Sequence, residues 1–68
     1  MSVAKVTEII ASSPKGFEDA IHVGIARAHK TLTNLKSAWI ESQQIMLNDD
    51  GQIREYRVQL KITLILED

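Results

Sequence analysis

The sequence predicts an α+β domain of order β-α-β-β, in which three strands form one antiparallel sheet against a single helix. Three observations predict it. The first segment is rich in β-branched residues, one stripe of apolar residues follows at helical spacing, and two long segments flank the turn sequence "NDDG". With 68 residues the chain is long enough for one domain, which we expect to span residues 1–68.

The N-terminal half predicts a strand followed by the helix. Residues 3–11, "VAKVTEIIA", predict the strand, and Ser13 followed by Pro14 predicts a helix start, because serine caps helices and proline suits the first helical position. The helix is expected over residues 14–33. Gly24 in its middle costs up to about 1 kcal/mol relative to alanine. Either that cost is tolerated, or another backbone lies close to the helix at this point.

The C-terminal half predicts a long hairpin. A strand is expected over residues 38–48, a turn over residues 48–51 and a second strand over residues 52–66. The even-numbered residues of the last strand from Tyr56 to Leu66 are apolar and should pack on the helix. The opposite face is expected to hold a mixed set that suits an interface better than a core: Trp39, Glu41, Gln43, Ile45, Arg57, Gln59, Lys61, Thr63 and Ile65.

Size and composition limit the class of protein. A domain this short buries only about 60% of its unfolded surface, and without cysteine it has no disulfides to stabilise it, so we expect oligomerisation. The formal net charge is −1 and no basic run is present, which argues against nucleic-acid binding. No apolar stretch is long enough for a membrane span or a signal peptide, so we expect a soluble, cytoplasmic protein.

Few residues carry recognisable chemistry. Trp39, the only tryptophan, is either an anchor between subunits or a surface for stacking a ligand. Arg57 is either an intersubunit ion-pair partner, with Glu41 or Glu55 as candidates, or a ligand contact. His22 and His29 are seven residues apart on the expected helix, about 10.5 Å along its axis, which is too far to ligate one metal.

The turn at residues 48–51 offers oxygen ligands of the kind that calcium takes, but the full calcium-loop pattern is absent. We therefore expect an ordinary turn and predict no metal ligands, while weak calcium binding is worth a test. No catalytic set of residues is recognisable, so we expect a protein that is not an enzyme.

The segments "VTEIIASSPKGFEDAI", "GIARAHKTLTNL" and "YRVQLKITLILED" resemble the dodecin family over nearly the whole chain. The resemblance implies a three-stranded antiparallel sheet partly wrapped around one helix. It also implies a hollow homododecamer of 23 symmetry that binds flavins at subunit contacts. In such proteins a tryptophan at the start of the second strand stacks on the flavin ring, and a glutamine of the last strand hydrogen-bonds its polar edge.

Both of these family positions carry other residues in this chain. Counting from Ser13-Pro14 without gaps, the family's tryptophan falls on Ser37 and its glutamine on Arg57. Trp39 should share a sheet face with Ser37, about 6.6 Å further along the strand. Arginine has donors only, whereas glutamine has a donor and an acceptor. The candidate ligand-binding residues are therefore Ser37, Trp39, Arg57 and Gln59.

Two functions follow from these observations. The first is a dodecin-like homododecamer that sequesters FMN, riboflavin or a related planar small molecule at subunit interfaces. The alternative is a shell of the same fold that binds no flavin and is structural or binds ions such as calcium weakly. An accessory subunit of a larger complex is a third hypothesis, which rests only on the small size of the chain.

Overall fold

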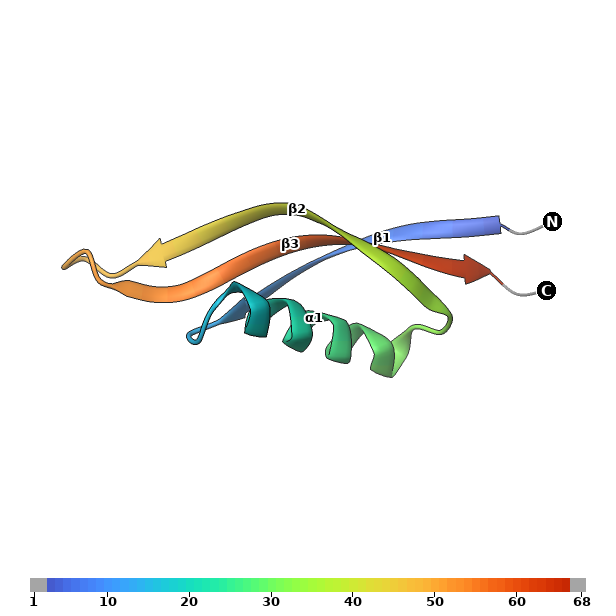
Figure 1. Ribbon diagram of the computed structural model, residues 1–68, viewed down its shortest axis with the longest axis horizontal. Helices are drawn as coiled ribbons and strands as arrows, with labels where there is room; N and C mark the ends of the chain where they lie inside the picture. Colours follow the sequence, from blue (N-terminus) through green and yellow to red (C-terminus); the bar gives the residue numbers. More distant parts are fainter. Residues whose placement is uncertain (1–2, 67–68) are drawn as a thin grey trace.

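Three strands and one helix make up the fold, in the predicted order. The computed structural model describes residues 3–66, over which the elements are β1 (Val3–Ser13), α1 (Phe17–Thr31), β2 (Leu35–Leu47) and β3 (Ile53–Leu66). All three strands pair antiparallel in one sheet (Figure 1). The predicted fold class is thereby confirmed.

The last strand lies in the centre of the sheet, which has the order β1-β3-β2. β2 and β3 form a hairpin, whereas β1 reaches β3 only after the chain has passed through α1, which lies along one face of the sheet (Figure 1). Both outer strands therefore pair with β3, and the residues of β3 define rows that run across all three strands.

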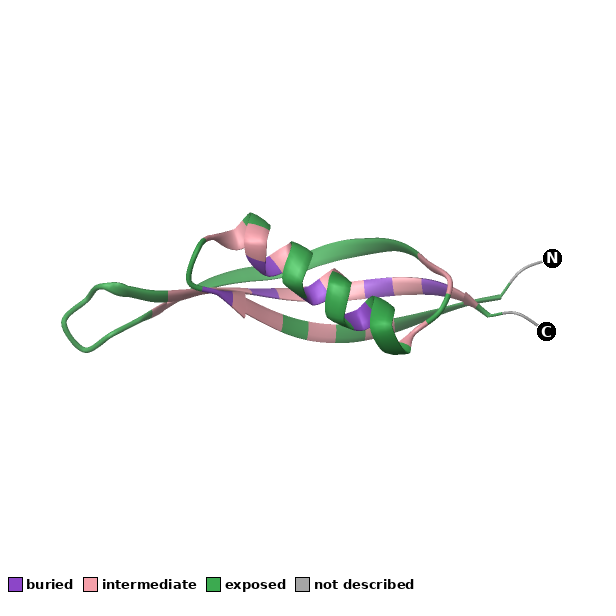
Figure 2. Cartoon of the chain, turned by 90° about the horizontal axis from the view of Figure 1, so that it is seen from below, coloured by how far each residue is buried: buried purple, intermediate pink, exposed green. Residues whose placement is uncertain are grey.

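The core lies between α1 and the even-numbered residues of β3, as predicted. Val58, Leu60 and Ile62 are at most 1% exposed, and they pack with Ala20 and Ala28 of the helix. Buried and less buried residues alternate along β3 (Figure 2). This alternation follows from the strand geometry, because successive side chains point to opposite faces of a sheet.

The predicted start of the helix was wrong. Ser13 is the last residue of β1 and α1 begins at Phe17, with Gly16 at the N-cap position. The Ser13 hydroxyl instead accepts a hydrogen bond from the Lys15 backbone N–H and donates one to the Asp19 carboxylate. The serine thus stabilises the β1–α1 connection from the strand side, while Pro14 lies in that connection.

Gly24 lies where β1 comes close to the helix, which agrees with the second of the two interpretations except that the nearest atoms belong to side chains and not to the backbone. A Cβ atom added at Gly24 would lie 2.9 Å from the Cβ atom of Ala11 and 3.3 Å from the Cδ1 atom of Ile9. Separations below 3.0 Å require the structure to shift. The absence of a side chain at residue 24 therefore allows α1 and β1 to pack this closely.

We call the face of the sheet that α1 does not cover the outer face. A bulge in β2 gives this face a different set of residues from the one that the sequence predicted. Ile40 pairs with Leu60, but the next paired residue, Ser42, pairs with Gln59, so Glu41 is an extra residue. An extra residue reverses the alternation beyond it. Gln43 and Ile45, predicted on the outer face, instead pair with Val58 and Tyr56 of the helix-facing set, and Ser42 and Gln44 take their places.

The β2–β3 hairpin continues past the N-terminal end of α1 (Figure 1). The chain is accordingly long and thin, with extents of 53 × 19 × 14 Å. Near the hairpin tip the large apolar residues Ile45, Leu47 and Ile53 remain exposed (Figure 2). The helix is too short to cover this part of the sheet, as its 15 residues span only about 22 Å.

Candidate functional site

The outer face of the sheet carries the candidate residues in successive rows. One row holds Val6, Thr63 and Ser37, and the next holds Glu8, Lys61 and Trp39. The following rows are Ile10, Gln59 and Ser42, and then Ser12, Arg57 and Gln44. The four predicted ligand-binding residues thus lie on one face, which confirms that Trp39 and Ser37 point to the same side.

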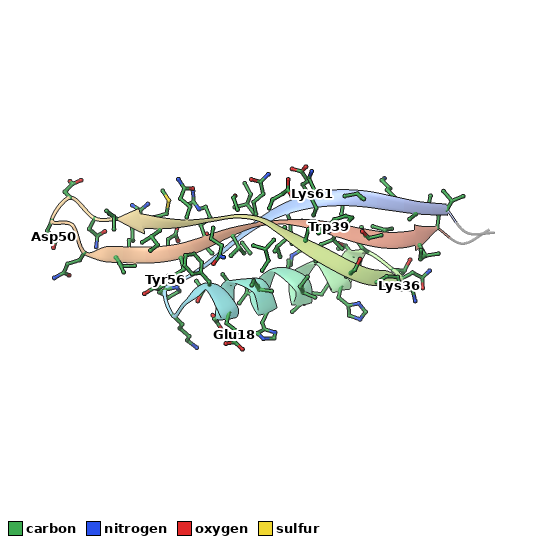
Figure 3. The ribbon with its side chains drawn as sticks, turned by 45° about the horizontal axis from the view of Figure 1, so that its top comes forward. Glu18, Lys36, Trp39, Asp50, Tyr56 and Lys61 are labelled. Atoms are coloured by element: carbon green, nitrogen blue, oxygen red, sulfur yellow. The ribbon has the colours of Figure 1, made fainter. Side chains whose placement is uncertain are left out.

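Trp39 offers the one large aromatic surface of this face within the described residues. Trp39 is 58% exposed and lies directly opposite Lys61, in the part of β2 between its first two register shifts. Lys61 and Trp39 are labelled close together on the sheet in Figure 3, while Tyr56 lies on the side of α1. Tyr56 packs edge-on against Phe17 of the helix, with ring centroids 5.2 Å apart. An exposed indole on a strand of the sheet provides a flat apolar surface for another ring or for a partner chain.

Lys61 lies between two carboxylates contributed by different strands. Its Nζ atom is 3.1 Å from Oε1 of Glu41 and 3.9 Å from Oε1 of Glu8. The hydrogen bond and the negative charge of Glu41 raise the pKa of Lys61 above its ordinary value, and the charge of Glu8 acts in the same direction. The lysine therefore stays protonated well beyond neutral pH.

Gln59 joins this group to the next row. Its Nε2 donates to Oε2 of Glu8 at 3.0 Å, and its Oε1 accepts from the hydroxyl of Ser42 at 3.3 Å. A primary amide has a second N–H and a second acceptor lone pair. The side chain is therefore held in place by two strands and still has one donor and one acceptor for a ligand.

Within its own chain Arg57 contacts Glu55 and Ser12, while its pairing with a partner subunit stays a prediction. Its Nη2 atom lies 2.6 Å from Oε1 of Glu55, and its Nε donates to the hydroxyl of Ser12 at 3.4 Å. Glu55 was one of the two predicted partners. The other, Glu41, pairs with Lys61.

The remaining predicted candidates lie away from this face. His22 is exposed on α1, with its Nε2 atom 3.9 Å from Oε1 of Glu18. The turn at residues 48–51 is a hairpin turn as predicted: Gly51 has a φ of 84°, its N–H donates to the Asn48 carbonyl, and the carboxylate of Asp50 accepts from the N–H of Gln52. Within residues 3–66 no group of three His, Cys, Asp or Glu side chains is arranged to hold a metal ion.

Sequence reasoning missed Glu8 and Ser42 as members of the outer-face group. Glu8 belongs to a strand distant in sequence, and only the pairing of Glu8 with Lys61 across β1 and β3 shows that it joins the cluster. Ser42 reaches this face because of the bulge at Glu41. A register argument that paired strand one with the last strand could have found Glu8, but the bulge has no comparable sequence signal here.

The comparisons with known proteins agree on one family. The family model described as Dodecin matches residues 3–67. The dodecin of Thermus thermophilus is 37% identical over 68 residues, which cover 97% of this chain and 94% of that protein. The calcium dodecin of Mycobacterium tuberculosis is 32% identical over 63 residues, which cover 93% of this chain and 87% of that protein.

Solved structures show the same relationship. The dodecin from Streptomyces davaonensis superposes with a TM-score of 0.92 at 37% identity, and the match covers 98% of this chain and 97% of that one. The structure of the M. tuberculosis calcium dodecin, described as calcium-chelating with a novel calcium-binding site, has a TM-score of 0.85 at 29% identity. That match covers 97% of this chain and 93% of the other.

The fold and its exposed outer face define a small binding protein of one helix and one sheet. The chain belongs to the dodecin family, whose members are oligomeric. No helix within residues 3–66 is long and apolar enough to cross a membrane.

Proposed function

We propose that this chain assembles into a dodecin-like hollow homododecamer that binds a flavin or a related planar ring on the outer face around Trp39, which we call the Trp39 face. The observation that carries the proposal is the exposed indole of Trp39, which lies on the outer face one row from the amide of Gln59. Stacking of a planar ring on an aromatic side chain contributes roughly 1–3 kcal/mol, judged from base–aromatic stacking. Ser37, at the family's tryptophan position, has no such surface.

The positions of Trp39 and Gln59 also support a ligand site between them: each lies two residues after the position of the family's corresponding contact residue. The family's two contact positions fall on Ser37 and Arg57, which are three rows apart on the sheet. Trp39 and Gln59 lie in adjacent rows instead, because β2 and β3 run antiparallel and each residue is displaced toward the other. The diagonal between such positions is about 7–8 Å, short enough for one ring to contact both. Gln59 offers the donor and acceptor that Arg57, already bonded to Glu55, does not.

The exposed apolar residues support the assembly. Ile45, Leu47 and Ile53 are exposed near the hairpin tip, and Val6 and Ile10 are exposed on the outer face of the edge strand β1. A small domain whose own helix leaves such residues uncovered is stabilised when other copies bury them. Native mass spectrometry of the protein as purified gives the copy number and any retained ligand. A monomer that stays folded in dilute solution would contradict the assembly.

Fluorescence titration tests the ligand. We expect micromolar protein to quench the emission of riboflavin or FMN, because stacking on an indole quenches the ring. Trp39→Ser should abolish the quenching and Trp39→Phe should retain part of it, since phenylalanine keeps a stacking surface. His29→Gln, on the exposed side of α1, is the matched control. Undiminished emission of both flavins would remove the flavin proposal.

Calcium binding is a second candidate function, favoured by the likeness to the calcium dodecin of M. tuberculosis. In this chain the acidic side chains of the hairpin turn, Asp49 and Asp50, are the candidate calcium ligands, and copies related by symmetry would have to bring several turns together. Isothermal titration with calcium chloride tests it. The double variant Asp49→Asn, Asp50→Asn should remove any heat that comes from this turn.

A further inference from the structure

The ionised side chains next to Trp39 give the Trp39 face a net negative charge. Glu8 and Glu41 contribute two carboxylates and Lys61 one ammonium, so the cluster carries one net negative charge when all three are ionised. Each of the three side chains is 36–52% exposed. Their charges are therefore partly hydrated, but they remain at the surface on which a ligand would lie.

The cluster is held in position by contacts with all three strands. Glu41 reaches Lys61 from the bulge of β2, and Glu8 reaches it from β1. The amide of Gln59 donates to Glu8 and accepts from Ser42, which ties the second carboxylate to β2 as well. The negative charge is thus built into the sheet next to Trp39, and it does not depend on one mobile side chain.

No nearby cation within residues 3–66 offsets this charge. Arg57 is two rows from Lys61 along β3, and Glu55 neutralises it at 2.6 Å. The whole chain has a formal net charge of −1, so an assembly of identical copies is negative overall as well. At about 0.15 M salt, charges act over roughly 8 Å, which includes a ligand stacked on the adjacent Trp39.

We propose that Glu8 and Glu41 make the Trp39 face selective for flavins without a phosphate, so that riboflavin binds more tightly than FMN. The inference rests on the proposed flavin binding. A phosphate monoester carries about −1.5 to −2 charges at pH 7, whereas the ribityl chain of riboflavin is neutral. Both ligands have the same ring, so stacking on Trp39 favours them equally and the electrostatic repulsion of the phosphate decides between them.

Paired titrations of the intact protein with riboflavin and with FMN test the selectivity. At low salt we expect a dissociation constant for FMN about fourfold above that for riboflavin, as expected for two charges facing one across roughly 10 Å of water. The ratio should fall toward one at about 0.5 M salt, where screening is strong. FMN binding that equals or exceeds riboflavin binding at low salt would overturn the inference and leave the flavin proposal standing. If neither ligand binds, the proposed function itself fails.

Charge-neutral variants locate the effect. Glu41→Gln and, separately, Glu8→Gln should reduce the ratio of the two dissociation constants, because each removes one negative charge and keeps the shape of the side chain. Glu18→Gln is the matched control: it changes the net charge of the chain by the same amount, but Glu18 is exposed on α1, on the opposite side of the sheet (Figure 3). If Glu18→Gln lowers the ratio as much as Glu41→Gln, the selectivity does not come from the cluster and the inference is wrong.

Discussion

The two faces of the sheet differ in what they do for the protein, although they are built from alternate residues of the same strands. The face toward α1 is apolar and buried, with Val58, Leu60 and Ile62 at most 1% exposed. The outer face carries an exposed tryptophan and a hydrogen-bonded group of charged and polar side chains. The apolar burial that stabilises the fold is therefore concentrated on one face, and the residues of the other face are available for the proposed ligand binding and assembly.

The largest expected effect of a substitution is on the helix-facing side. Leu60→Ala should lower the free energy of unfolding by about 2–5 kcal/mol, because it leaves a cavity in a core that has few large side chains. Its neighbour Gln59→Ala, on the outer face, should lower it by less than about 1 kcal/mol. Urea denaturation at one fixed protein concentration measures both. Equal losses in the free energy of unfolding would show that both faces contribute equally to stability, contrary to this comparison.

Gly24→Ala tests the packing between α1 and β1. Alanine favours a helix over glycine by about 1 kcal/mol, but overpacking costs about 1–3 kcal/mol, and the new Cβ atom would lie 2.9 Å from that of Ala11. We expect a net loss of about 1 kcal/mol in the free energy of unfolding. The double variant with Ala11→Gly should recover part of it, since the clashing atom is then absent. A gain in stability from Gly24→Ala alone would mean that the strand moves aside without cost.

An effect of the opposite sign is expected on the outer face. The hydroxyl oxygen of Thr63 is buried without a hydrogen-bond partner among residues 3–66. Thr63→Val removes that group at constant shape, so the free energy of unfolding should rise by about 1 kcal/mol. Thr33→Val, at an exposed position of the α1–β2 connection, should change it little. A loss of stability in Thr63→Val would show that a group of another copy bonds this hydroxyl in the assembly.

The core of the fold could be predicted from the sequence, whereas the start of the helix could not. The even-numbered residues of β3 and the helix stripe predicted the core, because burial follows the two-residue period of a strand and the 3.6-residue period of a helix. Ser13-Pro14 predicted a helix start three residues too early. A serine before proline can also end a strand and bond the turn, and the local sequence does not distinguish these roles.

The outer face was predicted only in part. Trp39, Lys61, Gln59 and Ser37 were placed on it correctly, whereas Gln43 and Ile45 were not, because the extra residue at Glu41 reverses the alternation along the rest of β2. The pairing of Arg57 with Glu55, two residues away in the same strand, was not predicted, and the predicted contacts of Arg57 with another subunit or a ligand stay predictions. Which of several possible partners a charged side chain takes depends on rotamer and register, not on composition.

The sequence by itself determined the order of the elements, the helix-facing core and the family, because each depends on periodicity or on motifs that lie within one segment. Only the tertiary structure decided that Glu8 and Glu41 share Lys61 beside Trp39, and that Gln59 is bonded to both neighbouring strands. The physical reason is that these contacts join residues far apart in the sequence, 51 apart for Gln59 and Glu8 and further for Lys61 and Glu8, and one bulge is enough to change which side chains meet.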